Sequence, residues 1–263
     1  AFSSASGGFT LDNFARMGTY TLVFTRSFKL AIIATLIALL IGYPVSYMLS
    51  KEGPQVQRIA MVLIMLPMWM NFLLRTYSWM SILENNGLLN QLFQQIGLID
   101  LYNQIAMHFA SDPAAYVPID HFQMIGTQGA VVLGMVYNYL PFMILPIYSV
   151  LVKLDHSLIE AARDLGASSV QVFRKVILPL SLPGVLSGIT MVFVPSVSTF
   201  AISRLLGGGT QMMLGDLIEQ QFLGGAYNPQ LGAAIALVMM AIVVVCMLVM
   251  NRFGDGEEQA VML

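Results

Sequence analysis

Charged residues are scarce in this sequence: of 263 residues, only 10% are Asp, Glu, Lys or Arg, whereas 57% are hydrophobic. A soluble domain carries about 25% charged residues. Together with the mean hydropathy of +0.76, this composition indicates that lipid is the solvent for most of the chain. The net charge of −2 argues against nucleic acid as a partner.

Cysteine and histidine are nearly absent as well. The single cysteine, Cys246, allows no disulfide within the chain. Three scattered histidines do not form a pattern typical of a zinc site. The sequence contains no G-x-x-x-x-G-K-[S/T] phosphate loop, and no lysine follows Gly207–Gly209. We therefore expect neither catalysis, nor a metal, nor a cofactor in this chain.

Five apolar runs are long enough to cross a bilayer, which takes about 20 helical residues. The predicted spans are residues 30–49, 59–82, 127–152, 182–203 and 231–250. We expect small residues in these runs to allow close helix packing; they are Gly134, Gly184, Ser187, Gly188, Gly232, Ala233 and Ala234. The expected fold class is an all-α membrane protein with one transmembrane domain over residues 1–263.

Basic residues set the expected orientation, because loops rich in Lys and Arg stay on the cytoplasmic side. Seven of the twelve lie on the face that we assign to the inside: Lys51, Arg58, Lys153, Arg163, Arg174, Lys175 and Arg252. With the C-terminus inside, five spans place the N-terminus outside. No segment before residue 30 is apolar enough to carry it across, so we expect that a first span is missing from this sequence.

The inside loop at residues 153–180 carries the most informative pattern. Ser157 and Glu160 match a capping box for a short helix, which Gly166 ends. Ser168 and Gln171 repeat the capping pattern for a second helix, which we expect to end near Pro179.

The first of these two helices has an apolar face that one loop cannot bury. Its members are Leu158, Ile159, Ala162 and Leu165. An exposed apolar patch rimmed by charge usually marks a partner surface. We therefore expect another protein to dock on this helix.

This loop resembles the "EAA" loop of type I ABC importer permeases. The matching residues are Glu160-Ala161-Ala162, Gly166 after three more residues, and Val176-Ile177-Leu178-Pro179 after nine further residues. The resemblance implies the MetI-like permease bundle, in which residues 157–166 dock into a groove of an ATPase subunit. It assigns ATPase coupling to Glu160, Ala161, Ala162, Arg163, Asp164 and Gly166. An alternative is that Glu160 only caps its own helix and Gly166 only ends it.

Residues 66–100 resemble permeases of the spermidine/putrescine importers through Pro67, Trp69, Asn71, Arg75, Tyr77, Trp79, Gly87-Leu-Leu-Asn-Gln and Gly97-Leu-Ile-Asp. This resemblance implies a multi-pass protein of the bacterial cytoplasmic (inner) membrane, with a further span before residue 1. The implied partners are an ATPase dimer that binds ATP and Mg, a second homologous permease subunit and an extracytoplasmic polyamine-binding protein.

The outside loops predict the charge of the cargo. After residue 76 their acidic residues are Glu84, Asp100, Asp112, Asp120, Asp216 and Glu219, opposed only by Arg204. A vestibule of one charge attracts the opposite ion, which favours a cationic solute. Asp216 and Glu219 are spaced to share one helix face and to hold an ammonium group. Alternatively, the orientation rule alone removes the basic residues, and the two acids cap or solvate a surface helix.

Aromatic residues provide further candidates for the cargo pathway, since cation–π contacts contribute about 0.5–2 kcal/mol each. The candidates are Trp69, Tyr77, Trp79, Tyr139 and Phe200. Aromatic residues at span ends also form the interfacial belt, so both interpretations stay open. Arg75 is expected to reach outward to the interface or to pair with Glu84.

Three other functions compete with a polyamine permease. The chain could serve an ABC importer for another small solute. It could be an ion-coupled secondary transporter or channel, although such proteins commonly carry charges at mid-membrane and the centres of these spans carry almost no acidic residues. It could also be a membrane scaffold without transport.

Overall fold

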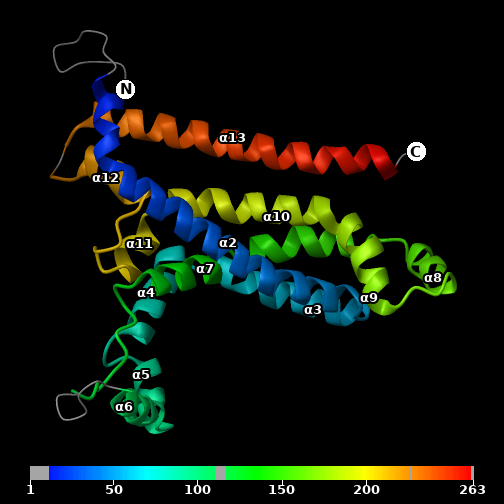
Figure 1. Cartoon of the computed structure of the whole chain (residues 1–263), viewed down its shortest axis with the longest axis horizontal. Coiled ribbons are helices and arrows are strands. Elements are labelled where there is room, and N and C mark those ends of the chain that lie inside the picture. Colours follow the sequence, from blue (N-terminus) through cyan, green and yellow to red (C-terminus); the bar gives the residue numbers. More distant parts are fainter. Residues whose placement is uncertain (1–11, 110–116, 226, 262–263) are drawn as a thin grey trace.

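The computed structural model describes residues 12–109, 117–225 and 227–261, and every regular element in these ranges is helical. Three long helices form the centre: α2 (Thr21–Ser50), α7 (Gln128–Leu151) and α10 (Leu178–Ser198). They lie side by side, and α13 (Pro229–Val261) runs along their flank (Figure 1). The expected all-α fold is confirmed.

Glycines bring the central helices together. A Cβ atom on Gly42 of α2 would lie 2.9 Å from the Met143 side chain of α7, and one on Gly188 of α10 would lie 2.8 Å from the Met143 sulfur. A Cβ on Gly184 would lie 2.8 Å from the carbonyl oxygen of Pro146. In membranes, small residues allow the backbone-to-backbone contact that holds helices together. The predicted packing role is therefore confirmed for Gly184 and Gly188.

The predicted span at residues 59–82 is not one straight helix. It consists of α3 (Pro54–Met65), the 3₁₀ turn η2 (Leu66–Trp69) and α4 (Phe72–Leu83), with a bend of 90°. Pro67 has no N–H to continue the helical hydrogen bonds. Asn71 then starts α4, because its side chain accepts the backbone N–H of Leu73 at 2.8 Å. Four described helices are long and apolar enough to span a membrane, or five if this bent pair is one span.

The end of the predicted span at residues 182–203 also differs. Helix α10 ends at Ser198, and α11 (Ala201–Leu206) is a separate short helix. Glycines then make a turn at Gly207–Gly209, with positive φ angles at Gly208 and Gly209. This region leads to α12 (Leu214–Leu223) beside the start of α13.

An arm of three helices leaves the bundle at a right angle (Figure 1). It is made of α4, α5 (Leu88–Gln95) and α6 (Leu98–Phe109). Neither α5 nor α6 belongs to a predicted span. The arm lies at the same end of the bundle as α11, α12 and α1 (Asp12–Arg16).

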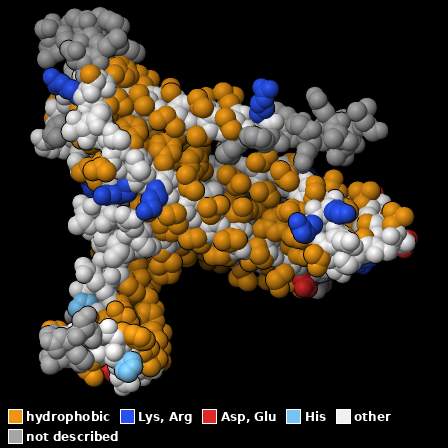
Figure 2. All heavy atoms as spheres, in the orientation of Figure 1, with side chains coloured by type: hydrophobic (Ala, Val, Ile, Leu, Met, Phe, Trp, Pro, Cys, Tyr) orange, Lys and Arg blue, Asp and Glu red, His pale blue; other side chains and the backbone are white. Residues whose placement is uncertain are grey.

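The opposite end carries α8 (His156–Asp164) and α9 (Ser169–Val172). Figure 2 shows basic side chains at both ends of the bundle and a broad apolar surface between them. Such a band is the expected surface for the hydrocarbon core of a bilayer. The end that carries α8 is the one that the basic loops assign to the inside.

Candidate functional site: the inside loop and the outer vestibule

Helix α8 begins two residues earlier than the sequence pattern predicted. Its N-cap is Asp155, whose carboxylate accepts the backbone N–H of Ser157 at 2.9 Å. The predicted capping box of Ser157 with Glu160 is therefore wrong. An Asp at the N-cap can replace a Ser there, because the side-chain oxygen of either residue accepts a free backbone N–H of the first turn. Glu160 is left exposed and is not needed to start the helix.

Gly166 ends α8 as predicted. Its φ angle is +80°, a conformation that glycine adopts without steric cost. Its N–H donates to the carbonyl of Arg163 at 2.8 Å, and the N–H of Ala167 donates to that of Ala162 at 3.1 Å. These two bonds form a Schellman motif.

The second helix of the loop starts as predicted, at a capping box of Ser168 and Gln171. It does not end near Pro179. Instead, α9 passes through a π turn at Phe173–Ile177 into α10, so that Ser169–Ser198 is one continuous helix of 30 residues. Pro179 lies in the first turn of α10. The inside loop is thus joined rigidly to a central span.

The predicted apolar face of α8 divides into two. Ile159 and Ala162 pack against the core cluster that contains Leu151 and Ile177. Leu158 and Leu165 point away from it and are 48% and 90% exposed. Of the six residues assigned to coupling, Ala162 is half-buried, and the exposed ones are Glu160, Ala161, Arg163, Asp164 and Gly166. One side of α8 therefore holds the bundle while the other presents apolar and charged side chains at the tip of the molecule (Figure 1).

At the outer end, Asp216 lies in the first turn of α12 and is only 4% exposed. Its carboxylate accepts the Ser203 hydroxyl at 2.6 Å and the Met213 backbone N–H at 2.9 Å. The Ser27 hydroxyl of α2 accepts the next N–H, that of Leu214, at 2.8 Å. The geometry thus gives Asp216 a capping contact, which was one of the two roles considered from the sequence.

Burial governs the acidity of Asp216. It raises the pKa of this carboxyl above its ordinary value of 3.8, while the hydrogen bonds from Ser203 and Met213 and the charge of Arg204 act in the opposite direction. The nearby carboxylate of Glu219 adds to the rise. A carboxyl that loses water on folding is harder to ionise.

Glu219 is paired with Arg204, the one basic residue of the outer loops after residue 76. Its two oxygens lie 3.0 Å and 2.7 Å from the two terminal nitrogens of Arg204. This two-point geometry is the preferred one for Arg and carboxylate. Among the other predicted vestibule acids, Glu84, Asp100 and Asp120 are exposed, and Asp112 lies outside the described residues. The role of Asp216 and Glu219 in attracting cargo stays a prediction.

The five aromatic candidates do not gather in one place. Trp69, Tyr77 and Phe200 are exposed, whereas Trp79 and Tyr139 pack against a core cluster around α7. The ring of Trp79 meets that of Tyr137 edge to face at 5.3 Å. Among the described residues, one cavity lies behind α8, one between α2, α10 and α13, and one beside Asp216, and none of the five candidates lines any of these three.

Arg75 departs from both roles expected of it. It is only 8% exposed, so it does not reach outward to water, and the described residues contain no ion pair between it and Glu84. Two of its nitrogens, Nε and Nη1, are buried without a hydrogen-bond partner. Arg75 lies close enough to Tyr139 for its charge to act on the phenol.

Sequence reasoning missed the contacts that cross between distant segments. Ser27 and Ser203 are ordinary serines in apolar runs, and nothing local marks them as partners of α12. Asp155 was the exception, because a local signal was available: Asp directly before a helical run is a common N-cap.

Comparisons with known proteins agree with this geometry. The family model for binding-protein-dependent transport system inner membrane components matches residues 2–256. The spermidine/putrescine transport system permease protein PotB of Escherichia coli strain K12 is 37% identical over 246 residues, which are 93% of this chain and 82% of that protein. The inner membrane ABC transporter permease protein YdcU of the same strain is 28% identical over 88% of this chain and 71% of that protein.

Solved structures share the fold. A chain of a bacterial ABC transporter involved in the import of the acidic polysaccharide alginate superposes with a TM-score of 0.74 at 15% identity, over 97% of this chain and 86% of that chain. A chain from inward-facing conformations of the MetNI methionine ABC transporter gives a TM-score of 0.58 at 19% identity, over 94% and 98%. At such low identities these likenesses concern the fold alone.

Proposed function

This chain belongs to the family of binding-protein-dependent transport system inner membrane components, and from that premise we propose that it forms half of the pathway through which an ATP-driven importer moves a polyamine. Membership makes it an inner-membrane permease without catalysis of its own. The polyamine cargo is supported by the relatives that are named for spermidine and putrescine. It is also supported by the exposed acids of the outer loops.

The observation that carries the proposal is the exposed half of α8. Leu158 and Leu165 form an apolar stripe beside Glu160 at the inside tip of the molecule. Isolated apolar side chains on a surface need no explanation, but here they share a short helix that projects from the bundle. A docked ATPase subunit, as one of a dimer that binds ATP and Mg, would cover this stripe.

Helix α8 is also coupled mechanically to the central spans through its packing. Ile159 and Ala162 pack in a cluster with Leu151 at the end of α7 and Ile177 before α10. Helix α9 continues into α10 without a break. A displacement of α8 by the ATPase therefore moves the inner ends of two central spans, and packed interiors respond by shifting between discrete arrangements. Alternating access of the pathway would follow.

A second permease subunit would complete the pathway. Helix α3 has no buried residue although it is largely apolar, so this chain alone leaves its surface uncovered. We place the partner permease on this surface. At the outer end, a polyamine-binding protein would deliver the cargo to the acidic loops, where Asp216 and Glu219 would attract the cation without holding it tightly.

The test is ATP-dependent uptake of labelled spermidine by proteoliposomes that contain both permeases, the ATPase and the binding protein. Glu160→Arg should abolish co-purification of the ATPase and uptake, because it reverses a charge on the docking face. Glu52→Arg is the matched control on the other inside loop, where the side chain is also exposed, and it should leave both unchanged. Asp216→Asn combined with Glu219→Gln should slow uptake more at low than at high ionic strength.

Different results would overturn different parts. Transport of an anion or a sugar in place of spermidine would remove the cargo assignment and leave the importer. Uptake by this chain alone under an ion gradient, without the ATPase, would replace the importer with a secondary transporter. A complex whose ATP hydrolysis ignores the binding protein would point to a scaffold.

A further inference from the structure

A cavity of about 210 Å³ lies behind α8, between the inside loop and the ends of the spans. The polar side chains that line it are Tyr47, Ser50, Lys51, Arg163 and Ser169. Apolar side chains, among them Leu151 and Ile159, close its other sides. None of the described lining residues is acidic. The cavity is therefore polar and cationic on one side and apolar on the other.

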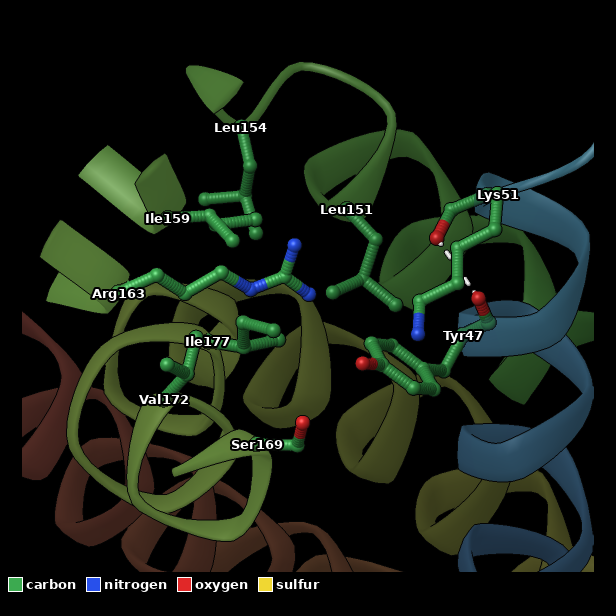
Figure 3. Close-up of a pocket in the computed structure, with 10 residues that line it drawn as sticks. Tyr47, Lys51, Leu151, Leu154, Ile159, Arg163, Ser169, Val172 and Ile177 are labelled. Atoms are coloured by element: carbon green, nitrogen blue, oxygen red, sulfur yellow. Dashed lines mark hydrogen bonds between the residues drawn. The ribbon is translucent and has the colours of Figure 1, made fainter. Parts of the chain in front are cut away.

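Two cations from distant parts of the sequence point into this space. Figure 3 shows Arg163 extending from the α8 side and Lys51 from the end of α2 on the opposite side. The ammonium of Lys51 lies 3.9 Å from the centre of the Tyr47 ring. The only ion pair among the described residues joins Arg204 and Glu219 at the other end of the molecule. Within the part of the chain that the structure describes, neither cation of the cavity thus forms an ion pair with a carboxylate.

One helix start adds to the positive potential of the cavity, and it opposes the dipoles of α2 and α7, whose C-terminal ends lie at the same cavity. Ser169 is the first residue of the 30-residue helix that continues into α10, and its hydroxyl faces the cavity in Figure 3. The first N–H groups of a helix and its dipole favour an anion. The two side chains and the helix end together suit a phosphate group, which accepts several hydrogen bonds at once.

We propose that this cavity binds the phosphate of an anionic phospholipid headgroup from the inner leaflet, held between Lys51, which directly follows α2, and Arg163 of α8. A lipid is favoured over free phosphate because the cavity lies at the inner ends of α2 and α7, where headgroups lie, and because its lining is apolar on one side. Basic pockets between helices on the cytoplasmic side commonly bind such headgroups.

A bound headgroup would have a mechanical effect. Lys51 belongs to the central bundle and Arg163 to the coupling helix, so a phosphate that contacts both ties the two together. ATP hydrolysis should then respond more strongly to the loaded binding protein when anionic lipid is present. This inference needs the membrane placement and the coupling role of α8, but not the polyamine cargo.

The experiment uses the whole transporter complex in nanodiscs of phosphatidylcholine, with or without phosphatidylglycerol. Native mass spectrometry measures phosphatidylglycerol that stays bound, and ATP hydrolysis is followed in parallel. Lys51→Gln and Arg163→Gln should each weaken retention about fivefold, and the double variant should lose the lipid dependence of hydrolysis. The charge-preserving Lys51→Arg and Arg163→Lys should retain the lipid, which separates lost binding from misfolding.

Arg58→Gln with Lys153→Gln is the matched control, since both residues are exposed on the inside face but do not line the cavity. This pair should keep the bound lipid. If the control pair loses as much lipid as the cavity variants, the basic inside face attracts the lipid as a whole, and the proposed site is wrong. Occupancy by inorganic phosphate that excludes phosphatidylglycerol would overturn the lipid as the source. If the cavity variants lose the ATPase while they retain the lipid, the cations serve protein docking and the proposal is wrong.

Discussion

At the scale of single residues, the carboxyl group of Asp216 does structural work that its place in the sequence did not reveal. It joins the start of α12 to Ser203 of α11, and Ser27 of α2 binds the neighbouring N–H. The buried carboxyl thus fixes α12 to α11, and Ser27 fixes the start of α12 to a central span. Removing its oxygens would take away the partner of the buried Met213 N–H, at about 1–3 kcal/mol for such a group. The Ser203 hydroxyl would keep its contact with the Phe200 carbonyl at 2.9 Å.

We expect Asp216→Ala to lower the thermal midpoint of the purified complex, whereas Asp216→Asn should lower it less because the amide oxygen still accepts a hydrogen bond. The raised pKa also sets a pH dependence. The contribution of this carboxyl to stability is fully present below its unfolded value of 3.8 and is lost as the pH rises through the higher folded pKa.

The midpoint of the wild type minus that of Asp216→Asn should therefore fall as the pH rises through that window, and then become constant. Scanning calorimetry or fluorescence across the acidic range measures it. Asp100→Asn, which removes an exposed carboxylate from the first turn of α6, is the control. A difference that rises with pH would contradict the proposed effect of burial.

At the scale of elements, the contact of α7 with α10 depends on the absence of side chains. Gly184 and Gly188 are one helical turn apart, and both approach α7 closely. Ser187, between them in sequence, lies on the exposed face of the same helix. This difference provides a test of the packing in which both substitutions add the same apolar side chain.

Gly184→Leu should destabilise the bundle by about 1–3 kcal/mol or more, because the new side chain must enter space held by the Pro146 carbonyl and Val150. Ser187→Leu adds the same side chain where lipid can receive it and should be tolerated. Folded yield in detergent and the thermal midpoint distinguish the two. Equal losses would show that the close approach of α10 to α7 does not matter for stability.

At the scale of the whole molecule, no other part of the described chain buries a residue of α3. Leu63 in this helix is 61% exposed, and Leu248 of α13 is exposed to a similar extent. Both surfaces suit lipid by composition alone. Only on the surface that packs against the second permease should a change in side-chain shape weaken the complex.

Leu63→Trp should therefore reduce co-purification of the second permease, since a larger side chain disturbs a fitted interface. Leu248→Trp, an identical change on α13, should leave the complex intact because lipid adapts to it. Affinity purification from membranes with quantification of both permeases measures the outcome. If Leu248→Trp breaks the complex and Leu63→Trp does not, α13 rather than α3 forms the interface.

The sequence by itself determined the features that depend on neighbouring residues. Long apolar runs specified the membrane and most of the spans, because each helix satisfies its own backbone in lipid. Gly166 and the Ser168–Gln171 box marked helix ends, since capping involves residues three or four positions apart. The motif from Glu160 to Pro179 indicated the family because all its residues lie within one short segment of the sequence.

Only the tertiary structure decided the features that depend on contacts between distant segments. Hydropathy could not detect the break at Pro67–Asn71, because the residues on both sides are equally apolar. Nor could it separate Ile159, which packs on the bundle, from Leu158, which is exposed, since only the position of α7 and α10 distinguishes the two sides of α8. The cavity between Lys51 and Arg163 exists for the same reason: 112 positions in the sequence separate two side chains that folding brings to one space.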